Sequence, residues 1–221
     1  MAAIAPVVPL FEGFLDHEAE PVKRILAAAE RCLFRDGYGG MSIRDVAEEA
    51  GVSKSLLHYH FRSKEHLLLE VQVAVYNRLA AQVTEAVDAI EPGAARALLA
   101  YDALVERLRA VEELPVLAEI QARAMTNPRL QAQAARLRDY LCDRIVEMLT
   151  AFLGPDLARF PLAPRVTADL LLGVVTGLGL QAGIDRTPER VEAAFAGLRA
   201  LLAAALGQLG EESSWTSKRS H

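Results

Sequence analysis

Apolar residues recur at helical spacing along most of this chain, and no segment sustains the strict alternation that a half-buried strand would show. The first clear period starts at Pro21 and runs through Val22, Ile25, Leu26, Ala29, Cys32 and Leu33. Proline suits the first turn of a helix and glycine suits its end. The pattern therefore predicts a helix from Pro21 to about Gly37.

Three serines mark the starts of the next three helices. Ser42, with Asp45 three residues later, has the form of a capping box, in which side chain and backbone satisfy each other's donors. Ser53 and Ser63 stand before two further helical segments, and Gly51 breaks the first of the three. We expect helices over residues 42–50, 53–61 and 63–90.

Beyond Pro92 the pattern becomes that of long amphipathic helices separated by proline and glycine. They are predicted at residues 94–111, 115–126, 129–153, 165–184 and 188–208. In the segment 129–153, one stripe of apolar residues faces a single side, which favours burial in a helical bundle. The predicted fold class is all-α, with an N-terminal three-helix helix-turn-helix domain followed by a larger helical-bundle domain.

These elements predict four regions along the chain. Residues 1–17 have no apolar period and are expected to be a disordered arm, and the polar residues 210–221 a disordered tail. Residues 18–66 form the predicted helix-turn-helix domain. Residues 67–209 form the larger predicted helical domain.

Composition narrows the class of protein. Of 221 residues, 52% are hydrophobic but only 6% aromatic, which suits Ala- and Leu-rich helices. The N-terminus lacks a basic signal-peptide region, and the longest apolar run, residues 170–180, is shorter than the roughly 20 residues of a membrane span. We expect a cytoplasmic protein with no membrane partner. Its net charge of −5 means that any DNA-binding surface must be local.

Cysteine and histidine spacing does not predict a metal site or a cofactor. Cys32 and Cys142 match no ligand pattern and are expected to be reduced and buried. His58 and His60 are two residues apart, so on a helix they point to nearly opposite sides and cannot share a tetrahedral ion.

The segment 42–61 predicts two short helices joined by a tight glycine turn, the geometry of a helix-turn-helix. Charge separates across this turn: residues 42–50 hold one arginine against three acids, and residues 51–66 hold three bases against one acid. The basic side is expected to face DNA, with donors for base edges on the second helix and a phosphate clamp at Lys64. The predicted DNA-binding residues are Ser42, Arg44, Ser53, Lys54, Ser55, Leu56, His58, Tyr59, His60 and Lys64.

Residues 22–70 resemble the DNA-binding domain of the TetR family of transcriptional repressors. The shared pattern is Ser42-Ile43, Val46-Ala47, Ala50-Gly51-Val52-Ser53, Leu57, Phe61 and Ser63-Lys64-Glu65, and it covers about a third of the chain. The resemblance implies a homodimer that binds operator DNA and leaves it when a small effector binds the C-terminal domain. Residues 67–209 would then be a helical-bundle ligand-binding and dimerisation domain, which binds the effector. Leu56 and His58 stand where relatives commonly have Thr and Tyr, so the operator sequence does not follow from relatives.

Two further sites are predicted in the C-terminal part. Glycines at 173, 177, 179 and 183 weaken a helix unless backbones approach closely there, so we expect a subunit interface. The alternative is close packing within one monomer. The predicted interface residues are Gly173, Gly177, Leu180, Phe195, Leu198 and Leu202. The candidate effector-binding residues are Tyr101, Gln121, Met125 and Cys142, polar or soft side chains on apolar faces.

Other functions remain as alternatives at this point. A helix-turn-helix can be an ordinary packing unit, and an all-helical bundle can be an enzyme. The sequence shows no nucleophile–base pair, metal-ligand set or phosphate loop. A DNA-binding protein without sequence preference is a third possibility, which competition by bulk DNA would reveal.

Overall fold

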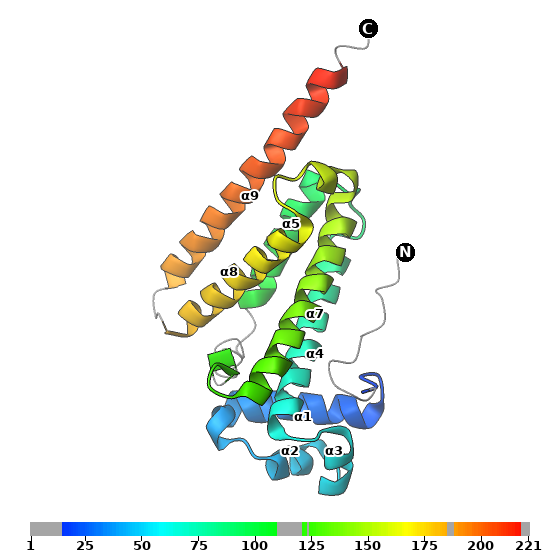
Figure 1. The fold of residues 1–221 in the computed structure, drawn as a ribbon, viewed down its shortest axis with the longest axis vertical. Coiled ribbons are helices and arrows are strands. Elements are labelled where there is room, and N and C mark those ends of the chain that lie inside the picture. The colour runs from blue at the N-terminus through cyan, green and yellow to red at the C-terminus, as the bar shows by residue number, and fades with distance from the viewer. Residues whose placement is uncertain (1–14, 110–120, 123, 185–187, 218–221) are drawn as a thin grey trace. The chain divides into compact units, whose positions relative to one another are not determined.

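The computed structural model describes residues 15–109, 121–122, 124–184 and 188–217, and every regular element in these ranges is helical (Figure 1). This confirms the predicted all-α class. The elements are α1 (Glu20–Gly40), α2 (Ile43–Ala50), α3 (Lys54–His60), α4 (Lys64–Ala86), α5 (Ala94–Arg109), α7 (Pro128–Leu153), the 3-10 helix η1 (Gly154–Arg159), α8 (Pro164–Ile184) and α9 (Pro188–Ser217). Most of the predicted helix 115–126 lies outside the described residues.

Contacts divide the chain into two compact units. Unit 1 comprises Met1–Tyr76 and Val116–Leu141, and unit 2 comprises Asn77–Pro115 and Cys142–His221. The sequence predicts a boundary after residue 66 instead. The difference arises because α4 continues without a break and residues 66–73 are all buried, so the start of this helix belongs to the core of unit 1.

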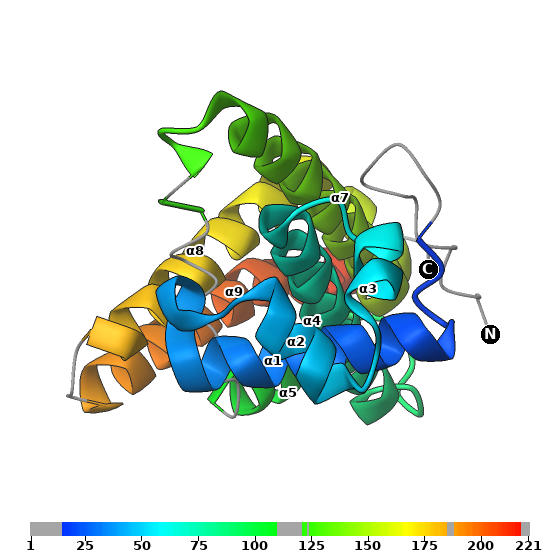
Figure 2. The same cartoon turned by 90° about the horizontal axis from the view of Figure 1, so that it is seen from below.

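In unit 1, α2 packs against α1 and α3 packs against α2 (Figure 2). Fully buried side chains of α1, including Ile25 and Leu33, supply apolar surface for this core. Helix α1 kinks where the sequence predicts its end, since Gly37 has φ 66°, but the helix resumes and continues to Gly40. Glycine allows this kink because it has no Cβ to clash in the left-handed region.

In unit 2, α9 packs against both α5 and α8. A cluster of buried side chains joins these three helices to the later part of α4: Leu79, Tyr101, Val105, Leu108, Val175 and Phe195. The predicted disordered tail requires a correction, because α9 continues through residues 210–217 to Ser217. This stretch lacks proline and contains two glutamates, and adding residues to an existing helix costs far less than nucleating one. Residues 218–221 lie outside the described residues.

Candidate nucleic-acid interface

Helix α2 begins at the capping box that the sequence predicts. The Ser42 hydroxyl accepts a hydrogen bond from the Asp45 backbone N–H at 3.2 Å, and the Ser42 N–H donates to the Asp45 carboxylate at 3.1 Å. The Ser42 hydroxyl also donates to the Asp45 carboxylate at 2.6 Å, and this bond, together with that from the Ser42 N–H, lowers the pKa of Asp45. Gly51 ends α2 in the left-handed conformation, with φ 63° and ψ 39°, which glycine adopts at little cost. Both ends of α2 are therefore fixed by local chemistry.

Helix α3 buries one side and exposes the other. Ser53 caps it by accepting a hydrogen bond from the Leu56 N–H at 3.1 Å. Leu57 and Phe61 are fully buried. On the opposite side Tyr59 is 82% exposed, and its ring meets that of His60 edge-on with centroids 5.0 Å apart. The buried side chains of Leu57 and Phe61 thus hold α3 in the core of unit 1, and the polar side of the helix faces solvent.

The structure places most of the predicted DNA-binding side chains on this outward surface. Leu56 and His60 are half-buried, and Arg44 binds Glu48 with its Nε at 2.8 Å. Because Arg44 shares its charge with this carboxylate, it contributes less positive field than an isolated arginine. The exposed members of the set are Ser42, Arg44, Ser53, Lys54, Ser55, His58 and Tyr59.

Lys64 lies differently from its predicted position as a phosphate clamp. Its half-buried side chain turns back toward α1, where Nζ donates to the backbone carbonyls of Tyr38 and Met41, the latter at 2.6 Å. The same ammonium lies 4.3 Å from the centre of the Tyr38 ring. Spacing alone could not predict this contact, because it joins positions 26 and 23 residues apart.

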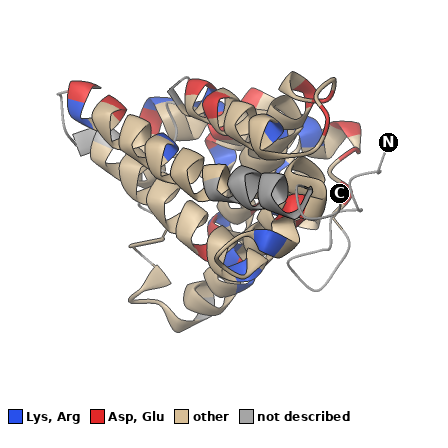
Figure 3. Ribbon diagram, turned by 90° about the horizontal axis from the view of Figure 1, so that it is seen from above, with Lys and Arg blue, Asp and Glu red and all other residues tan. Residues whose placement is uncertain are grey.

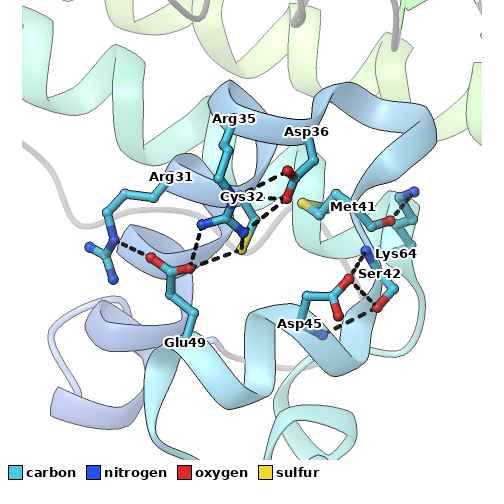
Figure 4. A network of polar contacts seen from close by, with 9 residues as sticks. All are labelled: Arg31, Cys32, Arg35, Asp36, Met41, Ser42, Asp45, Glu49 and Lys64. Atoms are coloured by element: carbon cyan, nitrogen blue, oxygen red, sulfur yellow. Dashed lines mark hydrogen bonds and ion pairs between the residues drawn. The ribbon is translucent and has the colours of Figure 1, made fainter.

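An ion-pair network that the sequence analysis missed joins α1 to α2 (Figure 4). Arg31 Nε donates to Glu49 at 2.8 Å, and Arg35 donates to the other oxygen of the same carboxylate at 2.9 Å. These bonds hold the pKa of Glu49 down at about 2. The buried Cys32 thiol contacts Glu49 at 3.6 Å, and burial followed by the nearby carboxylate raises its pKa. The network fixes α2 on α1 near the end of α2 that lies away from the capping box.

A second polar cluster lies at the start of α4. Glu70 is 3% exposed, and its carboxylate accepts a hydrogen bond from His17 at 2.7 Å and lies 3.5 Å from His66 Nε2. Burial alone would raise the pKa of Glu70, but the contacts with His17 and His66 lower it. This cluster holds the segment before α1 against α4 within unit 1.

The effector candidates fall into two pairs. In unit 2, the buried Tyr101 donates its hydroxyl to the Phe195 carbonyl at 2.8 Å, and burial followed by the Asp102 charge raises its pKa to about 12. The buried Cys142 thiol lies 3.2 Å from an Asp169 oxygen. In unit 1, Gln121 is exposed and Met125 is 77% exposed. No single unit brings all four together, and the assignment stays a prediction.

The predicted interface residues fall into two groups, one on α8 and one at the core of unit 2. Gly173, Gly177 and Leu180 lie on one side of α8 that we call the open face, together with the exposed Val166, Leu170 and Val174. Phe195, in contrast, is 7% exposed and belongs to the core cluster of unit 2, against which Leu198 and Leu202 pack. These three residues of α9 therefore face inward rather than toward the open face.

Other site types find little support in the described part of the chain. It contains no group of three or more His, Cys, Asp or Glu side chains placed to hold a metal ion. Across the same ranges, none of the helices combines the length and the apolar character that crossing a bilayer requires. A hollow in unit 2 is lined by residues 154–155, 157–158 and 160–164 and contains none of the four effector candidates.

Comparison with known families matches the same segment as the helix-turn-helix. The family described as "Bacterial regulatory proteins, tetR family" matches residues 25–71, which span most of α1, all of α2 and α3 and the start of α4. The HTH-type transcriptional regulator UidR of Escherichia coli is 25% identical over 197 residues, covering 84% of this chain and 93% of its own.

Solved structures show the same fold over nearly the whole chain. A TetR transcription regulator from Haloarcula marismortui has a TM-score of 0.66 at 22% identity, covering 85% of this chain and 98% of its own. A TetR-family regulator from a Rhodococcus species has a TM-score of 0.64 at 24% identity, with coverages of 85% and 98%. At these identities the likeness concerns the fold.

Proposed function

We propose that this chain is a regulator of the TetR family, a homodimeric repressor that a small-molecule effector releases from its operator. The observation that carries the proposal is α3: seven residues, anchored by buried Leu57 and Phe61 and presenting an exposed lysine, serine and tyrosine. An α-helix with its side chains is about 10–12 Å across, which the major groove, about 12 Å wide, can admit.

Charge supports DNA as the partner of this surface. Residues 51–66 carry three basic side chains against the single acid Glu65, although the whole chain has a net charge of −5. Lys54 stands at the first position of α3, where a cation is not explained by the helix dipole, because that end already carries partial positive charge. An exposed cation there is better explained by a negatively charged partner. DNA phosphates are such a partner.

Dimerisation through the open face of α8 is supported by what the monomer leaves uncovered. No Lys, Arg, Asp or Glu occurs between Leu170 and Ile184 (Figure 3). A Cβ placed on Gly173 or Gly177 would meet nothing within 4 Å. The alternative is that these two glycines allow close packing inside one chain. That would require a neighbouring element against them, and the described part of the chain places none there. A second copy of the chain would bury this surface.

Helix α9 adds a matching strip of exposed small residues and one large one. Leu201 is 70% exposed, and a Cβ on Gly197 would also meet open space. Small side chains let two helices approach closely, and the face of α9 opposite Phe195 thus fits the same interface. The proposed contact residues on α9 are Ala193, Ala194, Gly197, Ala200, Leu201 and Ala204 in place of Phe195, Leu198 and Leu202.

Effector release is the finer part of the proposal, and the family premise supports it. An effector acts only if it binds the two arrangements of the DNA-binding domains unequally, and a coupling of about 1–3 kcal/mol would lower operator affinity roughly 5- to 150-fold. Thermodynamic reciprocity supplies the check: the operator must weaken effector binding by the same factor. A compound that binds free and DNA-bound protein equally would be excluded as the effector.

Selection of DNA sequences by the purified protein, followed by footprinting on the selected site, tests sequence-specific binding. Tyr59→Ala should change which sequences are selected and cost about 1–3 kcal/mol on the original site, because an 82% exposed side chain on α3 can reach base edges. Lys23→Ala is the control, since Lys23 lies on α1 paired with Glu18 at 2.6 Å. Absence of any selected sequence would contradict the proposal and favour a binder without sequence preference.

A further inference from the structure

Lys64 lies where the helix-turn-helix ends and α4 begins. It is the first residue of α4, yet its ammonium contacts the carbonyl of Met41, the residue directly before the Ser42 cap of α2 (Figure 4). The Tyr38 carbonyl accepts a second hydrogen bond from the same Nζ. The Lys64 side chain therefore connects the end of α1, just before α2, to the start of α4, just after α3.

The two carbonyls have a physical need for such a donor. They lie in the last turn of α1 and at its C-cap, where backbone carbonyls have lost their partners in the helix and carry partial negative charge. Met41 is 2% exposed and Tyr38 is 9% exposed, so water reaches this end poorly. A lysine ammonium can satisfy both carbonyls and interacts favourably with the helix dipole.

The neighbouring contacts fix Tyr38 from both sides. The Lys64 ammonium lies 4.3 Å from the ring centre, a distance at which a cation is attracted to the face of an aromatic ring. The Tyr38 hydroxyl donates to Glu65 at 3.1 Å. Two consecutive residues of α4 thus hold one aromatic residue of α1.

We propose that Lys64 is a positioning residue, whose ammonium caps the end of α1 and holds the two ends of the helix-turn-helix together, and that it is not a phosphate ligand. The ammonium has three N–H donors, and at least two of them bind carbonyls in the free protein. These bonds direct the ammonium toward the end of α1 and leave at most one donor for any other group. The proposal rests on the proposed function, because the orientation that Lys64 fixes is that of the DNA-binding helix.

Amine-reactive labelling of the free protein tests the position of the ammonium without any substitution. The chain has four lysines, at 23, 54, 64 and 218, and mass spectrometry can follow each. Lys54 is exposed and serves as the internal reference. We expect Lys64 to react at least ten-fold more slowly than Lys54. Equal rates would overturn the proposal, whatever the protein binds.

The dependence of DNA affinity on salt separates positioning from phosphate contact. Each lost phosphate contact lowers the slope of log K against log salt by about one unit. Lys64→Met should weaken binding about ten-fold at every salt concentration with an unchanged slope. Lys54→Ala, which removes an exposed cation, should lower the slope. A slope lowered by about one unit in Lys64→Met would overturn the proposal.

The same series distinguishes positioning from a purely structural role. Affinity is measured well below the unfolding temperature of each variant, where the protein is fully folded. If Lys64→Met lowers only the unfolding midpoint and leaves affinity unchanged, the positioning role is wrong. If Lys64→Met does not fold, the labelling rates decide. Failure of the wild-type protein to bind any DNA would contradict the proposed function instead, and the labelling result would still stand.

Discussion

The helix-turn-helix and the open face of α8 differ in how far the chain itself covers their apolar side chains. Around the helix-turn-helix, Ser42 and Ser53 cap their own helices, Glu49 binds two arginines, and the apolar residues Leu57 and Phe61 are fully buried. On α8, Leu170 is 53% exposed, and it lies on the same face as Gly173 and Gly177, where an added Cβ would meet nothing within 4 Å. The first region is covered within one chain, whereas the second leaves apolar surface exposed, which our proposal assigns to contact with a second copy.

This difference predicts how each region responds to substitution. Changes in the helix-turn-helix should alter the stability of the chain itself. Changes on the open face should alter assembly, and through it the affinity for a DNA site that two copies share.

The largest expected effect comes from the core beneath α3. Phe61→Ala should cost about 3–5 kcal/mol of unfolding free energy, because it leaves a cavity where a fully buried ring was packed. Leu201→Ala is its counterpart in unit 2. Because Leu201 is 70% exposed, its truncation should change the stability of the isolated chain by no more than about 0.5 kcal/mol. Chemical denaturation at low protein concentration measures both, and equal losses would remove the distinction between the two regions.

Gly177→Leu should affect assembly next most strongly. The added side chain has open space within the monomer but would stand between two closely packed helices in a dimer. We expect the dimer dissociation constant to rise about 100-fold, or roughly 2.7 kcal/mol, with the helical content unchanged. Ala151→Leu, at an exposed position of α7, is the matched control. Sedimentation equilibrium would contradict the proposed interface if Gly177→Leu stayed as dimeric as the control.

Much of the helix-turn-helix could be predicted because its signals are local. Ser42 with Asp45, Ser53 and Gly51 each act within four residues, and the structure confirms all of them. The Lys64 and Glu49 contacts join residues 14 to 26 positions apart, and only the folded chain reveals such partners. Phe195 was misplaced for a related reason: helical spacing identifies an apolar face but not which neighbour covers it.

Removing the cap of α2 should have a smaller effect. Ser42→Ala eliminates the acceptor for the Asp45 N–H and should cost about 1 kcal/mol of stability, the usual value for a lost N-cap. Ser42→Thr retains both the acceptor and the hydroxyl that donates to the Asp45 carboxylate, and it should recover most of that loss. Thermal unfolding measures both variants. A Ser42→Ala protein as stable as wild type would show that the Arg31–Glu49–Arg35 network alone holds α2.

The smallest effect concerns acid stability. The folded-state pKa of Glu49 lies near 2, below its ordinary value of 4.5, so the unfolded chain binds more protons between these values. Its contribution to stability is therefore present above about pH 4.5 and is lost as the pH falls toward 2. Glu49→Gln should make stability less dependent on pH in this window. Arg31→Gln, which removes the largest cause of the shift, should produce the same trend, and an unchanged pH profile in both would contradict it.

The central claim is that two copies of this chain present two α3 helices to one DNA site. Fluorescence anisotropy on the DNA that flanks its own coding sequence, titrated at concentrations well above the dissociation constant and repeated across salt concentrations, measures this most directly. We expect saturation at two chains per site, or a multiple of two, with affinity that falls steeply as salt rises and exceeds that for random DNA by at least ~10³-fold. Saturation at one chain per site, or equal affinity for random DNA, would contradict the account.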